Sequence, residues 1–390
     1  MIITILGLAG KDNKGNISYA YYDCSLLKKE SKEYLNSTDF LLQNFDDNFY
    51  LIGTEKAIDL QKEILDFNGK NVNFIEIEDN SVDDIFEEVF KLISMSNDKV
   101  LLDITHGFRH QQIPAIFSAT LYKFLNNGQL DIIFAKQIIV YKKYEYIYLN
   151  DYIDLTQLSL LLTGFIRTLN FVNSVEVDGL NTLAFVNFSK ALLSNDFKTL
   201  ISSYKNLFST IDSAKKNPKF NHLKSLFEEI ENILKDFKNF ENSKLHSQYL
   251  ILSKLMIDKN YYLLSLTYLF EAIRLYVSES FYNNGLIAKS YWEKVDRYKI
   301  NQDILSFVSQ EIQTNYKEGF YDNRFPNLYK KNRGIFNEIT EDYDSLRKLR
   351  NDLTHINPNK SQVDIKRSLE TLYDKIEQVI KSDKLKVINR

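Results

Sequence analysis

The sequence has few of the residues that mark disulfide-rich, zinc-binding or turn-rich proteins. Its one cysteine, Cys24, can form no internal disulfide and supports no zinc site. Four prolines and twelve glycines in 390 residues argue against a disordered chain or a scaffold of short, turn-rich repeats. The five histidines, at positions 106, 110, 222, 246 and 355, are too scattered to predict a metal site. We therefore expect no metal and no other cofactor.

The chain also lacks a long apolar segment and a strong excess of one charge. Its longest apolar run, near 158–162, is far shorter than a membrane span of about 18–20 residues. The start, MIITILGLAG, has no basic residue before its apolar stretch, so we interpret it as a strand rather than a signal peptide. A net charge of −3 excludes a generally basic coat for nucleic acid. We expect a soluble, cytoplasmic protein without a membrane partner.

What the chain does contain is a high aromatic content, with 27 Phe and 25 Tyr, and a change of pattern near residue 154. Before that point, strand and helix patterns alternate, which predicts a doubly wound, mostly parallel α/β sheet. Thr54 is the expected N-cap of a helix that runs to Phe67. The predicted strands are 2–8, 17–24, 49–53, 72–78, 100–105 and 130–134, followed by a hairpin of 138–142 and 146–149.

After residue 154 the apolar spacing is helical almost to the end of the chain. Since no strong linker is visible, we expect the two halves to be joined through a helix near 155–170. We divide the chain into an α/β domain of 1–154, a helical transmission region of 155–250 and an all-helical domain of 251–390. The predicted helices are 155–174, 180–195, 197–213, 220–238, 243–257, 260–283, 303–317, 341–356 and 361–381.

The segment 99–109, KVLLDITHGFR, is the most informative part of the sequence. Its apolar strand stops at a His-Gly pair, and a helical pattern begins within a few residues. In α/β proteins such a loop lies at the carboxyl end of a strand, where free amides at a helix start attract anions. The predicted ligand contacts are Thr105, His106, Gly107, Phe108 and Arg109. The alternative interpretation is a structural turn in which His106 makes local hydrogen bonds.

A second glycine loop follows the first strand and is expected in the same crevice. It consists of Gly7, Leu8, Ala9 and Gly10, which form a G-x-x-G pattern. Because the pattern is not G-x-G-x-x-G, a nicotinamide or flavin site is poorly supported.

Near the C-terminus, Arg350 and His355 form an Arg-x-x-x-x-His motif. At about 100° per residue, His355 and Asn351 point away from the apolar stripe of their helix, whereas Arg350 flanks that stripe. The face that bears His355 could close a site only against another surface, most simply a second copy of the chain. The alternative is a solvated histidine and an arginine that pairs with a carboxylate. Glu271 and Arg274, three residues apart, predict either an intrahelical ion pair or a pair that orients the Arg350 region.

Histidine and arginine suit the cleavage of RNA by its own 2′-hydroxyl, because histidine exchanges a proton near neutral pH and a guanidinium stabilises charge on phosphate. The nearby acids Glu341, Asp342, Asp344 and Asp352 form no convincing cluster for two-metal catalysis.

An α/β domain with Asp103-Ile104-Thr105-His106-Gly107 after a strand, followed by a helical half with Arg350-Asn351-x-x-x-His355, resembles the CARF–HEPN ribonucleases of type III CRISPR systems. The resemblance implies a Rossmann-like CARF domain at 1–154 and a HEPN domain at 251–390. It implies a homodimer whose CARF pocket binds a cyclic oligoadenylate of four or six units as an allosteric activator. Arg350, Asn351 and His355 of both chains would then cleave single-stranded RNA to 2′,3′-cyclic phosphate and 5′-hydroxyl ends in antiviral defence.

Two other functions remain open at the level of the sequence. The first is a receptor without nuclease activity, or a ring nuclease that degrades the activator in the CARF pocket. A basic helix-turn-helix would favour a transcription factor of this kind, and we find none. The second is a nucleotide-dependent enzyme with its chemistry in the N-terminal domain, which is disfavoured because the chain has no P-loop and no complete glycine-rich fingerprint.

Overall fold

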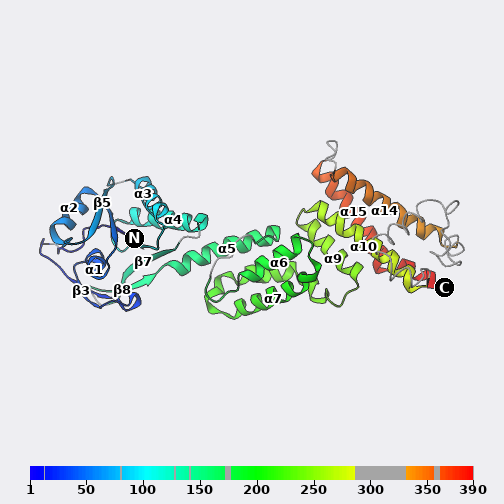
Figure 1. Cartoon of the computed structure of the whole chain (residues 1–390), viewed down its shortest axis with the longest axis horizontal. Coiled ribbons are helices and arrows are strands. Elements are labelled where there is room, and N and C mark those ends of the chain that lie inside the picture. The colour runs from blue at the N-terminus through cyan, green and yellow to red at the C-terminus, as the bar shows by residue number, and fades with distance from the viewer. Residues whose placement is uncertain are drawn as a thin grey trace. The chain divides into compact units, whose positions relative to one another are not determined.

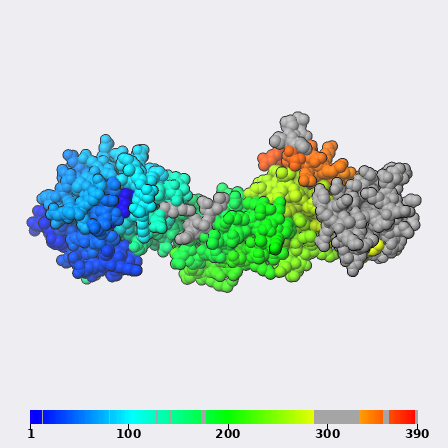
Figure 2. All heavy atoms as spheres, in the orientation of Figure 1, coloured from blue at the N-terminus to red at the C-terminus, as the bar shows by residue number. Residues whose placement is uncertain are grey.

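The computed structural model describes residues 1–12, 14–79, 81–126, 129–139, 142–171, 177–285, 331–354 and 361–389 (Figure 1). The chain divides into two compact units, the first of residues 1–161 and 173–182, the second of residues 162–172 and 183–390. Figure 2 shows most of the first unit in blue and cyan and the described residues of the second in green to red. The expected helix 303–317 lies outside the described residues.

The described residues of the first unit form an eight-stranded sheet in the order β3-β2-β8-β7-β6-β1-β4-β5. Neighbouring strands from β7 to β5 are all parallel, and β7 pairs antiparallel with β8, as β2 does with β3. The prediction of a doubly wound, mostly parallel α/β sheet is therefore confirmed. The strands are β1 (Ile2–Ile5), β2 (Ala20–Asp23), β3 (Lys32–Tyr34), β4 (Asn48–Gly53), β5 (Asn71–Glu76), β6 (Val100–Asp103), β7 (Leu130–Gln137) and β8 (Lys143–Tyr148).

Helices cover both faces of this sheet (Figure 1). On one face, α1 (Ser37–Asn44) and α2 (Glu55–Ile64) pack against alternate strand residues such as Phe49 and Leu51. On the other face, α3 (Asp83–Met95) and α4 (Arg109–Asn126) pack against the residues between them, such as Ile52. The alternation is required because successive side chains of a strand point to opposite faces. Thr54 caps α2 by accepting a hydrogen bond from the amide of Ala57, as predicted.

The predicted hairpin was wrong in its place and its bounds. β7 continues past residue 134 to Gln137, and its outer half pairs with β8, from Ile133 opposite Tyr148 to Gln137 opposite Tyr144. The two strands therefore belong to the main sheet and are not an appendage, and residues 140 and 141 lie outside the described part. The physical reason is that the edge of β7 opposite to β6 needs hydrogen-bonding partners, which β8 supplies.

Sequence patterns missed the segment that contains β3, α1 and the short 3-10 helix η1 (Ser25–Leu27). Helix α1 begins with Ser-Thr-Asp and has a weak apolar periodicity, because all of its first six residues are buried. Its N-cap Asn36 accepts a hydrogen bond from the amide of Asp39. The first turn of this helix contacts the candidate ligand loop through the hydrogen bond between Ser37 and His106.

The described part of the second unit is helical. Helix α5 (Asn150–Thr168) belongs to both units, which divide between residues 161 and 162. Helix α7 ends at Lys216, just before Asn217 and Pro218, because the residue before a proline avoids the helical region. The other helices are α6 (Leu183–Leu193), α7 (Phe197–Lys216), η2 (Pro218–Leu223), α8 (Lys224–Ile233), η3 (Lys235–Asn239), α9 (Leu245–Asp258), α10 (Tyr262–Asn283), α14 (Arg333–Thr354), α15 (Gln362–Lys381) and η4 (Lys384–Asn389).

One apolar core joins α9, α10, α14 and α15. Leu346 and Leu349 of α14 are fully buried in it and Leu353 packs at its edge, which agrees with the predicted apolar stripe. The boundaries between the two units lie between residues 161 and 183, and no boundary between units lies near residue 250. The division of the chain into three functional parts remains a prediction. Among the described helices, none is long and apolar enough to span a membrane.

Candidate functional site

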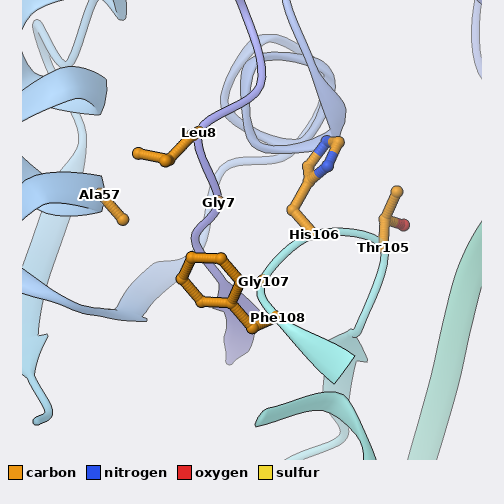
Figure 3. Close-up of a pocket in the computed structure, with 7 residues that line it drawn as sticks. All are labelled: Gly7, Leu8, Ala57, Thr105, His106, Gly107 and Phe108. Atoms are coloured by element: carbon orange, nitrogen blue, oxygen red, sulfur yellow. The ribbon is translucent and has the colours of Figure 1, made fainter. Parts of the chain in front are cut away.

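A pocket of about 170 Å³ lies where β1 and β6 end (Figure 3). The two strands are parallel neighbours, and Thr4 lies opposite Asp103 in their register, so the residues that follow emerge side by side. Strand β1 lies between β6 and β4 in the sheet, so the chain continues on one side of β1 with β4 and later on the other side with β6. α/β proteins bind ligands where the strand order changes direction in this way. The pocket is lined by Gly7, Leu8, Ala57, Thr105, His106, Gly107 and Phe108.

The two loops touch through their glycines. A Cβ atom on Gly7 would lie 2.8 Å from the backbone nitrogen of Gly107. Gly107 has a φ angle of +91°, and a Cβ atom there would lie 2.5 Å from Cγ2 of Ile5. Both positions therefore require glycine, one for the close approach of the loops and the other for its left-handed backbone as well.

Asp103, at the end of β6, holds the base of the pocket together. It is fully buried, and one of its carboxylate oxygens accepts hydrogen bonds from the hydroxyls of Thr4 at 2.9 Å and Ser37 at 2.6 Å. The other accepts from the amide of Thr105 at 3.0 Å and from the Thr105 hydroxyl. Since Ser37 gives its proton to Asp103, the hydroxyl of Tyr146 donates to Ser37 at 2.7 Å. Burial raises the pKa of Tyr146 well above its usual value, so Tyr146 stays a donor.

The hydroxyl of Thr105 is already used in hydrogen bonds within the protein, so it can contribute little to ligand binding. Its proton is given to Asp103, and its oxygen also accepts a hydrogen bond from the amide of Ala135 at 2.9 Å. One lone pair remains, and no proton is left to donate to a phosphate oxygen.

His106 points away from Phe108 and toward α1 (Figure 3). Its Nε2 accepts a hydrogen bond from the backbone amide of Ser37 at 3.0 Å, so the ring satisfies one of the free amides at the start of α1. Desolvation lowers the pKa of His106, which agrees with a neutral ring whose proton is on Nδ1. This hydrogen bond joins residues that are distant in the sequence, so it is not the local bond of a structural turn, and the ring positions the loop through α1.

Two side chains that sequence patterns did not identify hold the first glycine loop. Nε2 of Gln61 donates to the carbonyls of Gly7 at 2.8 Å and Ala9 at 3.0 Å. Nδ2 of Asn36 donates to the carbonyl of Ala9 at 3.1 Å and to Oε1 of Gln61 at 2.8 Å. Both residues are distant in sequence from the glycine loop, and no local pattern predicts their convergence. Gly10 does not line the pocket; the side chain of Ile64 lies against it.

The donors that face an anion come mainly from the backbone. The amide of Phe108 is bonded to Oε1 of Gln111 at 2.9 Å, whereas the amide of Gly107 forms no hydrogen bond within the described residues. Helix α4 begins at Arg109, which is exposed and outside the set of lining residues. The pocket thus combines a free amide and the start of a helix, which favours an anionic ligand.

The second candidate site lies on α14 in the second unit. Arg350 and Asn351 are both exposed there, and His355 lies outside the described residues. The guanidinium of Arg350 lies over the ring of Phe270, with Cζ 5.6 Å from the ring centroid, and it forms no ion pair within the described part of the chain. A carboxylate partner, which was the alternative for this arginine, is therefore not found there.

Phe270 of α10 connects Arg350 to the pair at 271 and 274. The buried guanidinium of Arg274 lies 5.2 Å from the centroid of the same ring and pairs with Glu271 at 3.0 Å. Tyr343 stacks on Phe270 at 4.8 Å. The predicted intrahelical pair is thus observed, and a shared aromatic ring joins it to Arg350. Among the described residues, no group of three His, Cys, Asp or Glu side chains could hold a metal ion.

No family model and no curated protein matches the chain. Among solved structures, the chain is similar to Enterococcus italicus Csm6 bound to cyclic hexa-2′-fluoro-hexa-dAMP. The similarity covers 99% of this chain and 96% of that chain, with a TM-score of 0.38 and 12% sequence identity. A TM-score of 0.38 is too low to carry residue roles from one chain to the other.

Proposed function

We propose that this chain is a metal-independent endoribonuclease that cleaves single-stranded RNA when a cyclic oligoadenylate binds its N-terminal domain. The observation that carries the proposal is the pocket at the ends of β1 and β6, where Gly7 and Gly107 bring two loops into contact. A free amide, a helix start and Arg109 suit the phosphates of a nucleotide ring. The proposed contact set is Gly7, Leu8, Ala9, Thr105, His106, Gly107, Phe108 and Arg109, without the buried Gly10.

The size of the pocket supports a ligand shared by two copies of the chain. Its volume of about 170 Å³ is below the 300–1,000 Å³ of ordinary small-molecule sites, and a ring of four or six nucleotides is larger still. A ring on a two-fold axis would place half of its units in each protomer. Such a ring would favour one arrangement of the two copies only by binding it more tightly than the other.

An exposed apolar stripe on α4 supports the same homodimer. Ile113, Phe117, Leu121 and Leu125 lie four residues apart, and each is between 40% and 64% exposed. Phe108, which lines the pocket, is 49% exposed just before the helix. Contiguous exposed apolar side chains of this kind mark interaction surfaces. We propose that a second copy covers the stripe next to the pocket.

In the proposed reaction His355 accepts the proton of the RNA 2′-hydroxyl, and the 2′-oxygen attacks the adjacent phosphorus. The bond to the 5′-oxygen breaks, and that oxygen takes up a proton, leaving a 2′,3′-cyclic phosphate and a 5′-hydroxyl. Arg350 stabilises the charge that develops on the phosphate, and Asn351 positions the histidine or the substrate. Because α14 exposes Arg350 and Asn351 without enclosing them, we propose that both copies contribute to one site.

The test is cleavage of a fluorescent single-stranded RNA in EDTA, with cyclic tetra-adenylate, cyclic hexa-adenylate or neither. We expect cutting with one ring only, and a His355→Ala variant that binds this ring but cuts at least about 1,000-fold more slowly. His222→Ala, at an exposed position in η2, is the matched control and should cut normally. Normal cutting by His355→Ala would overturn the catalytic assignment. Tight ring binding without cutting by the wild type would identify a receptor or a ring nuclease.

A further inference from the structure

A second hollow, of about 430 Å³, lies between α14 and α15. It belongs neither to the activator pocket nor to the proposed catalytic residues. Its floor is apolar, formed by the buried Leu349 and Leu372. Its rim is polar and basic, formed by Ser345 and Lys348 of α14 and by Arg367, Ser368 and Thr371 of α15. At this volume the hollow is large enough for one nucleotide unit.

The two cations of the rim differ from their basic neighbours. Lys348 and Arg367 are exposed, and neither forms an ion pair within the described residues. By contrast, Arg347 pairs with Asp344 at 3.4 Å, and Lys366 is 4.0 Å from Glu370. The rim therefore presents two uncompensated positive charges on facing helices, which is the arrangement that a phosphate group can bridge.

The rest of the rim suits the other parts of a nucleotide. The hydroxyls of Ser345 and Ser368 form no hydrogen bond within the described residues and can bond a ribose or a phosphate. The leucine floor offers an apolar surface to a base. Lys348 precedes Asn351 by three residues on the same helix, so the two side chains are neighbours on its surface. The hollow thus borders the part of α14 that bears Asn351.

We propose that the hollow, with Lys348 and Arg367 on its rim, binds the sugar-phosphate backbone of the RNA substrate next to the scissile bond. The proposal rests on the ribonuclease function and adds a substrate subsite to it. Single-stranded RNA fits better than a duplex because only a separated strand can place one nucleotide on the leucine floor.

The experiment measures binding of a fluorescent single-stranded RNA to full-length protein with saturating cyclic oligoadenylate, in a His355→Ala background that prevents cutting. Adding Lys348→Ala and Arg367→Ala should weaken RNA binding roughly tenfold at moderate salt, with activator binding unchanged. The slope of log affinity against log salt should fall by about 1.4, which is 0.7 for each phosphate contact on a single strand. Ser368→Ala alone should have a smaller effect.

The matched control removes the same charge elsewhere on the second unit. Lys190 of α6 and Lys224 of α8 are exposed and form no ion pair in the described part of the chain. Lys190→Ala with Lys224→Ala should leave RNA binding within about twofold. If both double variants bind RNA equally, the subsite is overturned while the ribonuclease function stands. If wild-type protein neither binds nor cuts RNA with either ring, the proposed function fails, and the subsite fails with it.

Discussion

The two candidate sites are built in opposite ways. In the first unit, the hydroxyl of Thr105 is fixed by two hydrogen bonds, one to the carboxylate of Asp103 and one from the amide of Ala135, on different strands. In the second unit, Arg350 and Asn351 stand exposed on one helix, and within the described residues Arg350 is held only by the ring of Phe270. The pocket has a shape without any ligand, whereas the described residues do not enclose Arg350 and Asn351 on α14.

This difference fits a protein in which ligand binding controls catalysis. A preformed pocket can recognise its ligand with little loss of conformational entropy. A catalytic surface that is incomplete in one copy is inactive by default and gains activity only when a particular arrangement of two copies is favoured. Four substitutions test the comparison, two that should break the pocket and two that measure smaller effects.

The largest effect is expected for Asp103→Ala, which removes the acceptor at the base of the pocket. The hydroxyls of Thr4 and Ser37 and the amide of Thr105 would lose their shared partner in a fully buried place. We expect a loss of roughly 4–5 kcal/mol in the unfolding free energy of the first unit, measured by chemical denaturation. Asp98→Ala, at an exposed position two residues before β6, should change it by less than about 0.5 kcal/mol. Equal stability of the two variants would show that the carboxylate does not hold the pocket.

Gly107→Ala should act on the same pocket through shape alone. The new methyl group would meet Cγ2 of Ile5 at 2.5 Å, and its backbone would keep a φ of +91°. Strain and overpacking together cost roughly 2–4 kcal/mol, so the concentration of cyclic oligoadenylate for half-maximal cleavage should rise strongly. Gly164→Ala is the control, because a Cβ atom there meets nothing within 4 Å. An unchanged activation curve for Gly107→Ala would mean that the two loops are not the ligand site.

Phe270→Leu tests whether the ring positions Arg350 on the catalytic surface. A cation–π contact contributes about 0.5–2 kcal/mol, so loss of the ring should lower the rate of the activated enzyme by roughly tenfold. RNA affinity and the activation curve should stay unchanged, and Phe270→Tyr, which keeps the ring, should restore most of the rate. Phe281→Leu changes the same volume in the same helix beside Phe336 and should not slow cleavage. If both leucine variants slow cleavage equally, the effect is general packing of α10.

The sequence predicted the parts of the fold that have local signals, and missed those that depend on distant contacts. The DITHGFR loop and its neighbour after β1 were placed correctly at one crevice, because parallel strands bring their carboxyl ends together. The anchoring of that crevice by Asn36 and Gln61 could not be predicted, because these residues lie on helices whose packing is decided by the whole sheet. For α14, helical spacing predicted the buried stripe, but not the contact of Arg350 with Phe270.

The smallest expected effect is a pH dependence that comes from His106. Since burial lowers its pKa in the folded state, the unfolded chain binds more protons below about pH 6.5, and stability falls as the pH decreases through that value. The loss is at most about 1.4 kcal/mol per pH unit, so we expect the first unit to lose roughly 1 kcal/mol between pH 7.5 and 5.5. Hydrogen exchange in β6 measures this loss. His106→Gln keeps an acceptor for the amide of Ser37 but cannot titrate, so its stability should be flatter over this range. An equally steep fall in the variant would mean that other groups cause the acid sensitivity and that the His106 ring is not held neutral against α1.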